Sequence, residues 1–130
     1  MDEFSLTYSQ STGALVDADR RVVAQGWSGN GEGKNNPAMQ DVHGVGPLPQ
    51  GRWRLGHWEA FHPGLGPLVC RLIQVEGETW GRDGFFIHGA SQVLDPSHGY
   101  GQESKGCLVL PRSQRELLQK TGVTHLQVVA

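Results

Sequence analysis

Hydrophobic and polar residues alternate at the start of the chain as they do in a half-buried strand. Phe4, Leu6 and Tyr8 are separated by single polar residues, which gives the two-residue period of a strand with one buried face. Further strand-like apolar stretches lie at residues 15–16, 22–23, 51–55, 68–75, 85–88 and 123–129. The pattern predicts a mainly β protein.

One segment has the features of a short helix. Ser113 and Glu116 have the spacing of a capping box, and Gly122 stands where helices commonly end. The 19 glycines among 130 residues favour short strands joined by many turns over a helical bundle. Because no internal repeat or linker interrupts the chain, we expect residues 1–130 to form a single mainly β domain with one short helix near residues 113–121.

Residues 26–49 are dense in Gly, Asn and Pro and show neither a helical nor a strand period. A structureless stretch of this length inside a compact domain is usually a functional lid or binding loop. A disordered surface loop is the alternative interpretation.

Charge and hydropathy exclude two classes of partner. The net charge is −2, and no run of Lys or Arg exceeds two residues, so the basic footprint of a nucleic-acid binder is missing. No apolar stretch approaches the roughly 20 residues that span a bilayer, so membrane insertion is not expected. Residues 1–5 lack the basic and apolar regions of a secretory signal. We therefore expect synthesis in the cytoplasm without a signal peptide.

The two cysteines have different surroundings. Cys70 alternates with apolar neighbours inside a strand-like run and is interpreted as a small core residue. Cys107 opens an apolar run directly after Gly106, and His88 closes another directly before Gly89. If these runs are adjacent strands, the imidazole can take the thiol proton and later protonate a leaving amine. The alternative is a buried Cys and a buried His with no chemical role.

Two neighbours of the cysteine could assist such chemistry. Gly106 lets the backbone turn sharply and direct N–H groups at a developing oxyanion. Ser104 could donate a further hydrogen bond there or hold the loop. We therefore treat Ser104 and Gly106 as candidate catalytic residues beside Cys107 and His88.

The order His88-Gly89 followed by Ser104-Lys105-Gly106-Cys107 resembles the signature of L,D-transpeptidases of the YkuD type. The segment 46–55 resembles the Gly-Pro-x-Pro-x-Gly-x-Tyr segment of that superfamily. More closely, the chain is similar to the Tlde1 group of small type VI secretion effectors. The shared segments are Trp27-Ser28-Gly29, Asn35-Asn36-Pro37, Gly46-Pro47-Leu48-Pro49 and 82–89.

The resemblance implies a YkuD-like fold of β-sandwich or mixed-sheet type and a cysteine L,D-carboxypeptidase or L,D-transpeptidase. The substrate would be the bond between the third residue of a peptidoglycan stem peptide and D-Ala. A backbone carbonyl beside the histidine, here that of Gly89, would orient the imidazole. The family's usual histidine before Gly-Cys is Lys105 in this chain, so Lys105 either favours the thiolate from a position near the site or is solvated.

The remaining polar candidates are less specific. Arg82 could bind a stem-peptide carboxylate or pair with Asp83 or Glu78 at the surface, and His98 and Tyr100 could contact substrate or be plain loop residues. The tryptophans are interpreted as core or rim residues rather than ligand stackers. A zinc peptidase is the rival enzyme class, but the histidines are scattered and no His-Glu-x-x-His is present, so we predict no metal and no cofactor.

These inferences predict a peptidoglycan-modifying toxin that a type VI secretion system carries into the periplasm of a target cell. A cognate immunity protein and a secretion-system carrier are the expected partners. The alternatives are a phage or prophage lysis enzyme of the same fold and an inactive cell-wall-binding module. Neither the balance of hydrolysis and D-amino-acid exchange nor the oligomeric state follows from the sequence.

Overall fold

The computed structural model describes residues 4–90 and 105–130. The strands are β1 (Ser5–Ser9), β2 (Ala14–Val16), β3 (Val22–Gln25), β4 (Trp27–Ser28), β5 (Gly51–His62), β6 (Gly66–Gly77), β7 (Phe86–His88), β8 (Leu108–Val109) and β9 (His125–Val129). The helix α1 spans Arg112–Thr121, and two 3₁₀ turns, η1 and η2, span Gly31–Gly33 and Pro37–Met39. Within the described residues the protein is mainly β with one short helix, as predicted.

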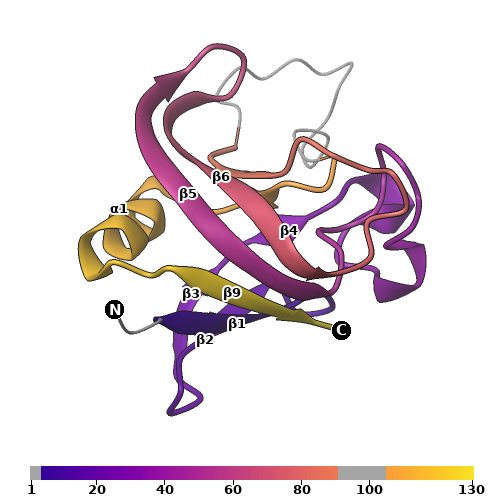
Figure 1. Ribbon diagram of the computed structural model, residues 1–130, viewed down its shortest axis with the longest axis horizontal. Coiled ribbons are helices and arrows are strands. Elements are labelled where there is room, and N and C mark those ends of the chain that lie inside the picture. Colours follow the sequence, from indigo (N-terminus) through magenta and orange to yellow (C-terminus); the bar gives the residue numbers. More distant parts are fainter. Residues whose placement is uncertain (1–3, 91–104) are drawn as a thin grey trace.

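The nine described strands form one mixed sheet in the order β3-β2-β1-β9-β5-β6-β7-β8-β4. β1 pairs with β9 and β7 pairs with β8 in parallel, whereas the other pairs are antiparallel. β5 and β6 form a long hairpin that dominates Figure 1. Both strands extend beyond the apolar runs 51–55 and 68–75 that the sequence shows. The register of the hairpin shifts between Leu55 and Trp58, and this irregularity interrupts the two-residue period by which the rest of β5 could have been recognised.

The two outer strands of this order are consecutive segments of the chain, separated by Gly26 alone. β3 pairs with β2, and β4 pairs with β8, so one stretch of chain serves both ends of the sheet and brings them together. A Cβ on Gly26 would lie 1.9 Å from the carbonyl oxygen of Val109, which leaves no room for any side chain. The sheet therefore curls back on itself around the core.

The core fills the inside of this curled sheet. Leu6 and Tyr8 of β1 are buried, as the alternation predicted, and Trp53 is almost completely covered. Cys70 is also buried in this cluster, as expected, and burial raises the pKa of its thiol to about 12. The position of Cys70 therefore agrees with a packing role.

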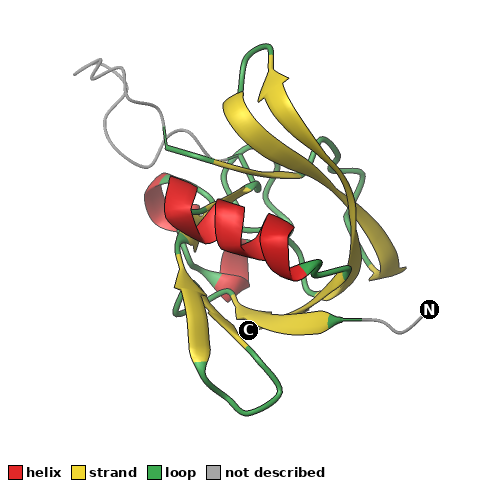
Figure 2. Ribbon diagram, turned by 90° about the vertical axis from the view of Figure 1, so that its left-hand side faces the viewer, coloured by secondary structure: helices red, strands yellow, loops and turns green. Residues whose placement is uncertain are grey.

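The helix α1 lies across one side of the sheet (Figure 2) and packs against β6 and β3. It ends at Gly122 in the left-handed conformation (φ 75°), as predicted. The predicted capping box is wrong, because the helix already begins at Arg112 and the backbone N–H groups of Gln114 and Arg115 donate to the Pro111 carbonyl. Glu116 instead pairs with Arg112 at 3.0 Å.

The expectation of a structureless stretch over residues 26–49 is also wrong. This stretch contains β4 and both 3₁₀ turns, and residues 46–49 are buried. The turns are stabilised by short-range hydrogen bonds to asparagine side chains, such as the one that Ala38 N–H donates to Oδ1 of Asn36. Such bonds leave no period in the sequence. Within residues 4–90 and 105–130, no helix is long and apolar enough to cross a membrane.

Candidate active site

The structure places His88 at the end of β7 and Cys107 one residue before the adjoining strand β8. β7 and β8 are parallel, with Ile87 opposite Leu108 and His88 opposite Val109. Continued by one residue, this register puts Cys107 opposite Phe86, two residues from His88 and hence on the same face. Strand spacing and rise then separate the Cα atoms of His88 and Cys107 by about 8 Å, a gap that an imidazole and a thiol facing each other can bridge.

Both side chains are shielded from solvent, His88 at 2% and Cys107 at 8% relative exposure. Behind them, Ile87 and Leu108 are completely buried in the core. The non-local pairing of β7 with β8 thus gives the two predicted residues a common, largely dry environment.

A backbone carbonyl fixes the imidazole of His88. Nδ1 lies 2.8 Å from the carbonyl oxygen of Gly89. Because a carbonyl only accepts hydrogen bonds, Nδ1 carries the proton, and the neutral ring then has its lone pair on Nε2. The expected contact between His88 and Gly89 is present, and it selects the tautomer that a general base needs.

The thiol of Cys107 is held mainly in its neutral form. Its Sγ donates to the carbonyl oxygen of Gly84 at 3.5 Å. Burial raises the pKa of the Cys107 thiol to about 11, although a backbone hydrogen bond from Phe86 and the positive charge of Arg82 act in the opposite direction. A base must therefore remove the proton when this sulfur acts as a nucleophile.

Gly106 is the position where the backbone turns into the cysteine. Its φ of 125° is unfavourable for other residues, and a Cβ there would lie 2.5 Å from Nη2 of Arg82 and 2.7 Å from the ring of Phe85. Only glycine allows the chain to pass this closely over the arginine.

Ser28 fixes the peptide group between Gly106 and Cys107. Its hydroxyl donates to the Gly106 carbonyl at 3.1 Å and accepts from the N–H of Leu48 at 2.7 Å. In a trans peptide the N–H points opposite to the carbonyl, so Ser28 directs the Cys107 N–H away from itself. Sequence reasoning assigned Ser28 no role, although it lies in the segment Trp27-Ser28-Gly29 that carries the family resemblance.

Arg82 is a buried connector rather than a surface residue. Its guanidinium donates to the carbonyls of Gln40, Pro47 (2.9 Å), Gly46 (2.9 Å) and Lys105 (3.2 Å) and lies over the ring of Phe85. The alternative of a surface ion pair with Asp83 or Glu78 is wrong, because these carbonyls take its donors. The arginine links residues 40–47 to the approach to Cys107, and its contact with substrate remains a prediction.

A second buried arginine, Arg115 of α1, supports the histidine side. It donates to the carbonyls of Leu110 (3.0 Å), Pro67 (2.6 Å) and Leu68 (2.7 Å). A Cβ on Gly89 would lie 2.5 Å from its Nη2, so the arginine packs directly against the residue that orients His88. No sequence signal marks Arg115, because it reads as an ordinary arginine on an amphipathic helix.

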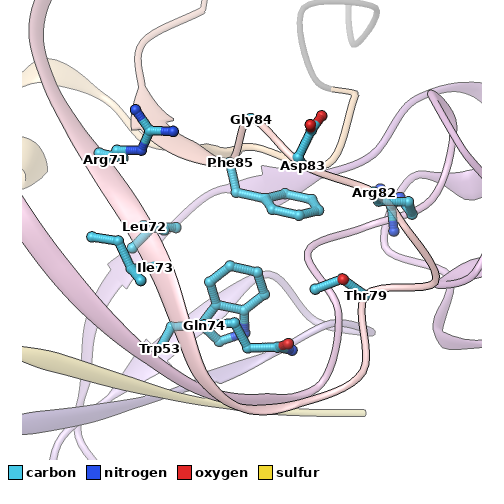
Figure 3. Close-up of a pocket in the computed structure, with 10 residues that line it drawn as sticks. All are labelled: Trp53, Arg71, Leu72, Ile73, Gln74, Thr79, Arg82, Asp83, Gly84 and Phe85. Carbon is cyan, nitrogen blue, oxygen red and sulfur yellow. The ribbon is translucent and has the colours of Figure 1, made fainter.

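A depression of about 200 Å³ lies beside the cysteine, between β6 and the segment 79–85. Figure 3 shows its lining residues, namely Trp53, Arg71, Leu72, Ile73, Gln74, Thr79, Arg82, Asp83, Gly84 and Phe85. Gly84 belongs both to this lining and to the contact with the Cys107 thiol. Gly84 therefore connects the depression with Cys107, which is not itself one of the lining residues.

The other predicted site residues are placed as follows. Ser104, His98 and Tyr100 lie outside the described residues, and their roles remain predictions. The side chain of Lys105 is exposed, which agrees with the solvated alternative. Within residues 4–90 and 105–130, no three His, Cys, Asp or Glu side chains are grouped so that they could hold a metal ion.

Comparison with protein families gave one match, in which the model of the Tlde1 domain covers residues 22–130. Searches of curated proteins and of solved structures gave no significant match. The matched range contains every described residue of the candidate site.

Proposed function

The chain belongs to the Tlde1 domain family, and on that premise we propose that it is a cysteine-dependent enzyme acting on peptidoglycan stem peptides. The observation that carries the proposal is the pairing of β7 with β8, which puts His88 and Cys107 on one face while the Gly89 carbonyl fixes the imidazole. The reaction is attack on the L,D bond between the third residue of a stem tetrapeptide and D-Ala.

In the first half of the reaction, Nε2 of His88 takes the proton from Cys107 as Sγ attacks the carbonyl carbon of the third residue. The C–N bond to D-Ala then breaks, and the imidazolium returns its proton to the departing amine. The products are free D-Ala and a thioester on Cys107. The neutral resting thiol makes His88 essential, because about 1 thiol in 10,000 would be ionised at pH 7 with a pKa of about 11.

The negative charge that develops on the substrate oxygen needs nearby donors. Ser28 orients the Gly106–Cys107 peptide by holding its carbonyl, which makes the N–H of Cys107 a candidate oxyanion donor. Ser104 is a further candidate. The positive charge of Arg82, held close behind Gly106, adds electrostatic stabilisation.

In the second half, water or the amine of a free D-amino acid attacks the thioester. His88 takes a proton from the incoming group, the C–S bond breaks, and the sulfur leaves as thiolate and regains the proton. Water gives a tripeptide with a free carboxyl group, which is L,D-carboxypeptidase activity. An amine gives an exchanged tetrapeptide, which is L,D-transpeptidase activity.

We propose that the biological setting is antibacterial. A type VI secretion system would carry the enzyme into the periplasm of a competitor, and an immunity protein would protect the producer. Production of the protein in the periplasm of a Gram-negative host should stop growth, whereas the Cys107→Ala variant should not. Growth arrest that is equal for both proteins would overturn the toxin mechanism.

The biochemical test is the release of D-Ala from purified tetrapeptide muropeptides, with and without an added D-amino acid, followed by mass spectrometry. Loss or exchange of D-Ala is expected with the intact protein and not with Cys107→Ala. Cys70→Ala is the matched control, because it removes the second, core-packed thiol and should retain activity. Unchanged tetrapeptide in all reactions would reject the enzyme and leave a binding module.

A further inference from the structure

We propose that Arg115 of α1 is a positioning residue for the reaction, because it fixes the Gly89 peptide whose carbonyl orients the imidazole of His88. The inference rests on the proposed function and extends it from the cysteine and the histidine to the helix behind them. Helix α1 thereby becomes part of the machinery that prepares the general base.

The guanidinium of Arg115 joins the two strands on either side of β7. Nε donates to the carbonyl of Leu110 at 3.0 Å, and Nη1 donates to the carbonyls of Pro67 and Leu68 at 2.6 and 2.7 Å. Leu110 follows β8, whereas Pro67 and Leu68 belong to β6, and these two strands are the neighbours of β7 in the sheet. The planar fork of donors is thus held by both strands, and the side chain of Arg115 is only 5% exposed.

The strand register places Gly89 between these contacts. The antiparallel register of β6 and β7, continued by two residues, puts Leu68 opposite Gly89. On the other side, the N–H of Leu110 donates to the carbonyl of His88 at 3.0 Å. Two of the residues that bind the guanidinium therefore flank the peptide between His88 and Gly89, so that a shift of Arg115 would reach this peptide from both sides.

The arginine also explains why residue 89 is a glycine. Gly89 is not among the glycines with a positive φ, so its backbone conformation is open to other residues. A Cβ at this position would lie 2.5 Å from Nη2 and 2.9 Å from Cζ of Arg115, and the three nearest atoms all belong to that guanidinium. Gly89 and Arg115 are therefore a coupled pair, in which the glycine leaves the space that the guanidinium fills.

This pair controls the protonation of the imidazole. Nδ1 of His88 donates to the Gly89 carbonyl at 2.8 Å, and while Nδ1 holds the proton, Nε2 of the neutral ring keeps its lone pair. If the Gly89 peptide rotates, the other tautomer gains population, and its Nε2 cannot accept the proton of a thiol. Loss of Arg115 should therefore lower kcat and leave KM nearly unchanged.

The kinetic test compares the release of D-Ala from tetrapeptide muropeptides by three variants. Arg115→Leu removes the guanidinium, so kcat should fall about tenfold to a hundredfold, with KM changed by less than about twofold. Arg115→Lys retains the charge and a donor without the planar fork and should recover part of the loss. Leu118→Ala is the matched control, because Leu118 is buried on the same helix and its truncation destabilises the fold without touching Gly89. It should retain kcat at a temperature where circular dichroism shows every variant to be folded.

The coupling is tested with Gly89→Ala and with the double variant. Gly89→Ala should lower kcat as Arg115→Leu does, because the added methyl group pushes against the guanidinium. The double variant should have a kcat no lower than that of Arg115→Leu alone, because leucine leaves room for the methyl group. Additive losses in the double variant, or a kcat of Arg115→Leu equal to that of Leu118→Ala, would overturn the proposal.

Histidine-selective nitrogen NMR separates this proposal from the proposed function, because the spectrum requires no enzyme activity. The resonances of His88, assigned by their absence from His88→Gln, should show a ring protonated at Nδ1. Arg115→Leu and Gly89→Ala should each give a mixture of the two tautomers, whereas Leu118→Ala should not. An unchanged tautomer in both variants would reject the positioning role, whereas a lack of D-Ala release by the unmodified protein would reject the proposed function.

Discussion

Replacement of Arg82 by methionine tests whether buried hydrogen bonds to the backbone stabilise the site. Methionine has a similar length and no donors, so the substitution removes the bonds to Gln40, Gly46, Pro47 and Lys105 without leaving a large cavity. Gly46 and Pro47 are buried, whereas Gln40 and Lys105 are at least partly exposed and can bond to water instead.

The expected magnitude follows from the two buried carbonyls. A buried acceptor that loses its partner costs about 1–3 kcal/mol, so the loss of two should lower the free energy of unfolding by roughly 2–6 kcal/mol. This loss is a large part of the 5–15 kcal/mol that is typical of a domain. The result therefore separates a structural arginine from an exposed one.

The assay is urea unfolding followed by tryptophan fluorescence, with the midpoint and the slope m fitted separately. Arg54→Met is the matched control, because Arg54 is exposed on β5, and substitutions of that kind usually change stability by about 0.5 kcal/mol or less. A midpoint for Arg82→Met equal to that of Arg54→Met, with unchanged m, would refute the reasoning.

Three other changes probe the surroundings of Cys107. Gly106→Ala should reduce both stability and D-Ala release, because its Cβ would clash with Arg82 and Phe85 at a φ of 125°. Gly64→Ala is the control, because Gly64 also has a positive φ but no atom lies within 4 Å of the added Cβ. Unfolding and D-Ala release of the two variants are compared, and equal effects would contradict the prediction. Ser28→Ala should lower kcat on the order of tenfold or more and leave KM nearly unchanged if the serine orients an oxyanion donor; equal effects on both parameters would contradict this. The alkylation rate of Cys107, measured by peptide mapping, should be low at pH 7 and continue to rise above pH 9. Burial raises the pKa of the thiol to about 11, and the reactive thiolate forms only as the pH approaches that value. A rate that reaches its plateau near pH 7 would show that the thiolate is already present.

The sequence predicted those features that depend on local patterns. The alternation of Leu6 and Tyr8 identified a buried face, Gly122 marked the end of the helix, and the apolar neighbours of Cys70 indicated the core. The glycine after His88 correctly marked the end of β7, whereas Cys107, which was expected to open a strand, lies one residue before β8. The family resemblance also correctly identified the Tlde1 domain.

The features that the sequence did not predict depend on contacts between distant segments. Nothing local shows that β7 pairs with β8 in the register that puts His88 and Cys107 on the same face. Arg82 and Arg115 look like surface residues until the folded chain surrounds them with carbonyls. Ser28 gains its role only when β4 pairs with β8 and brings its hydroxyl to Gly106.

The most direct test of a thioester on Cys107 is intact-protein mass spectrometry after rapid acid quenching of a reaction with tetrapeptide substrate. The account predicts an adduct with the mass of the tetrapeptide minus D-Ala, located on Cys107 by peptide mapping and absent from Cys107→Ala. Release of D-Ala by the Cys107→Ala variant at the rate of the unmodified protein, or an adduct on another residue, would contradict it.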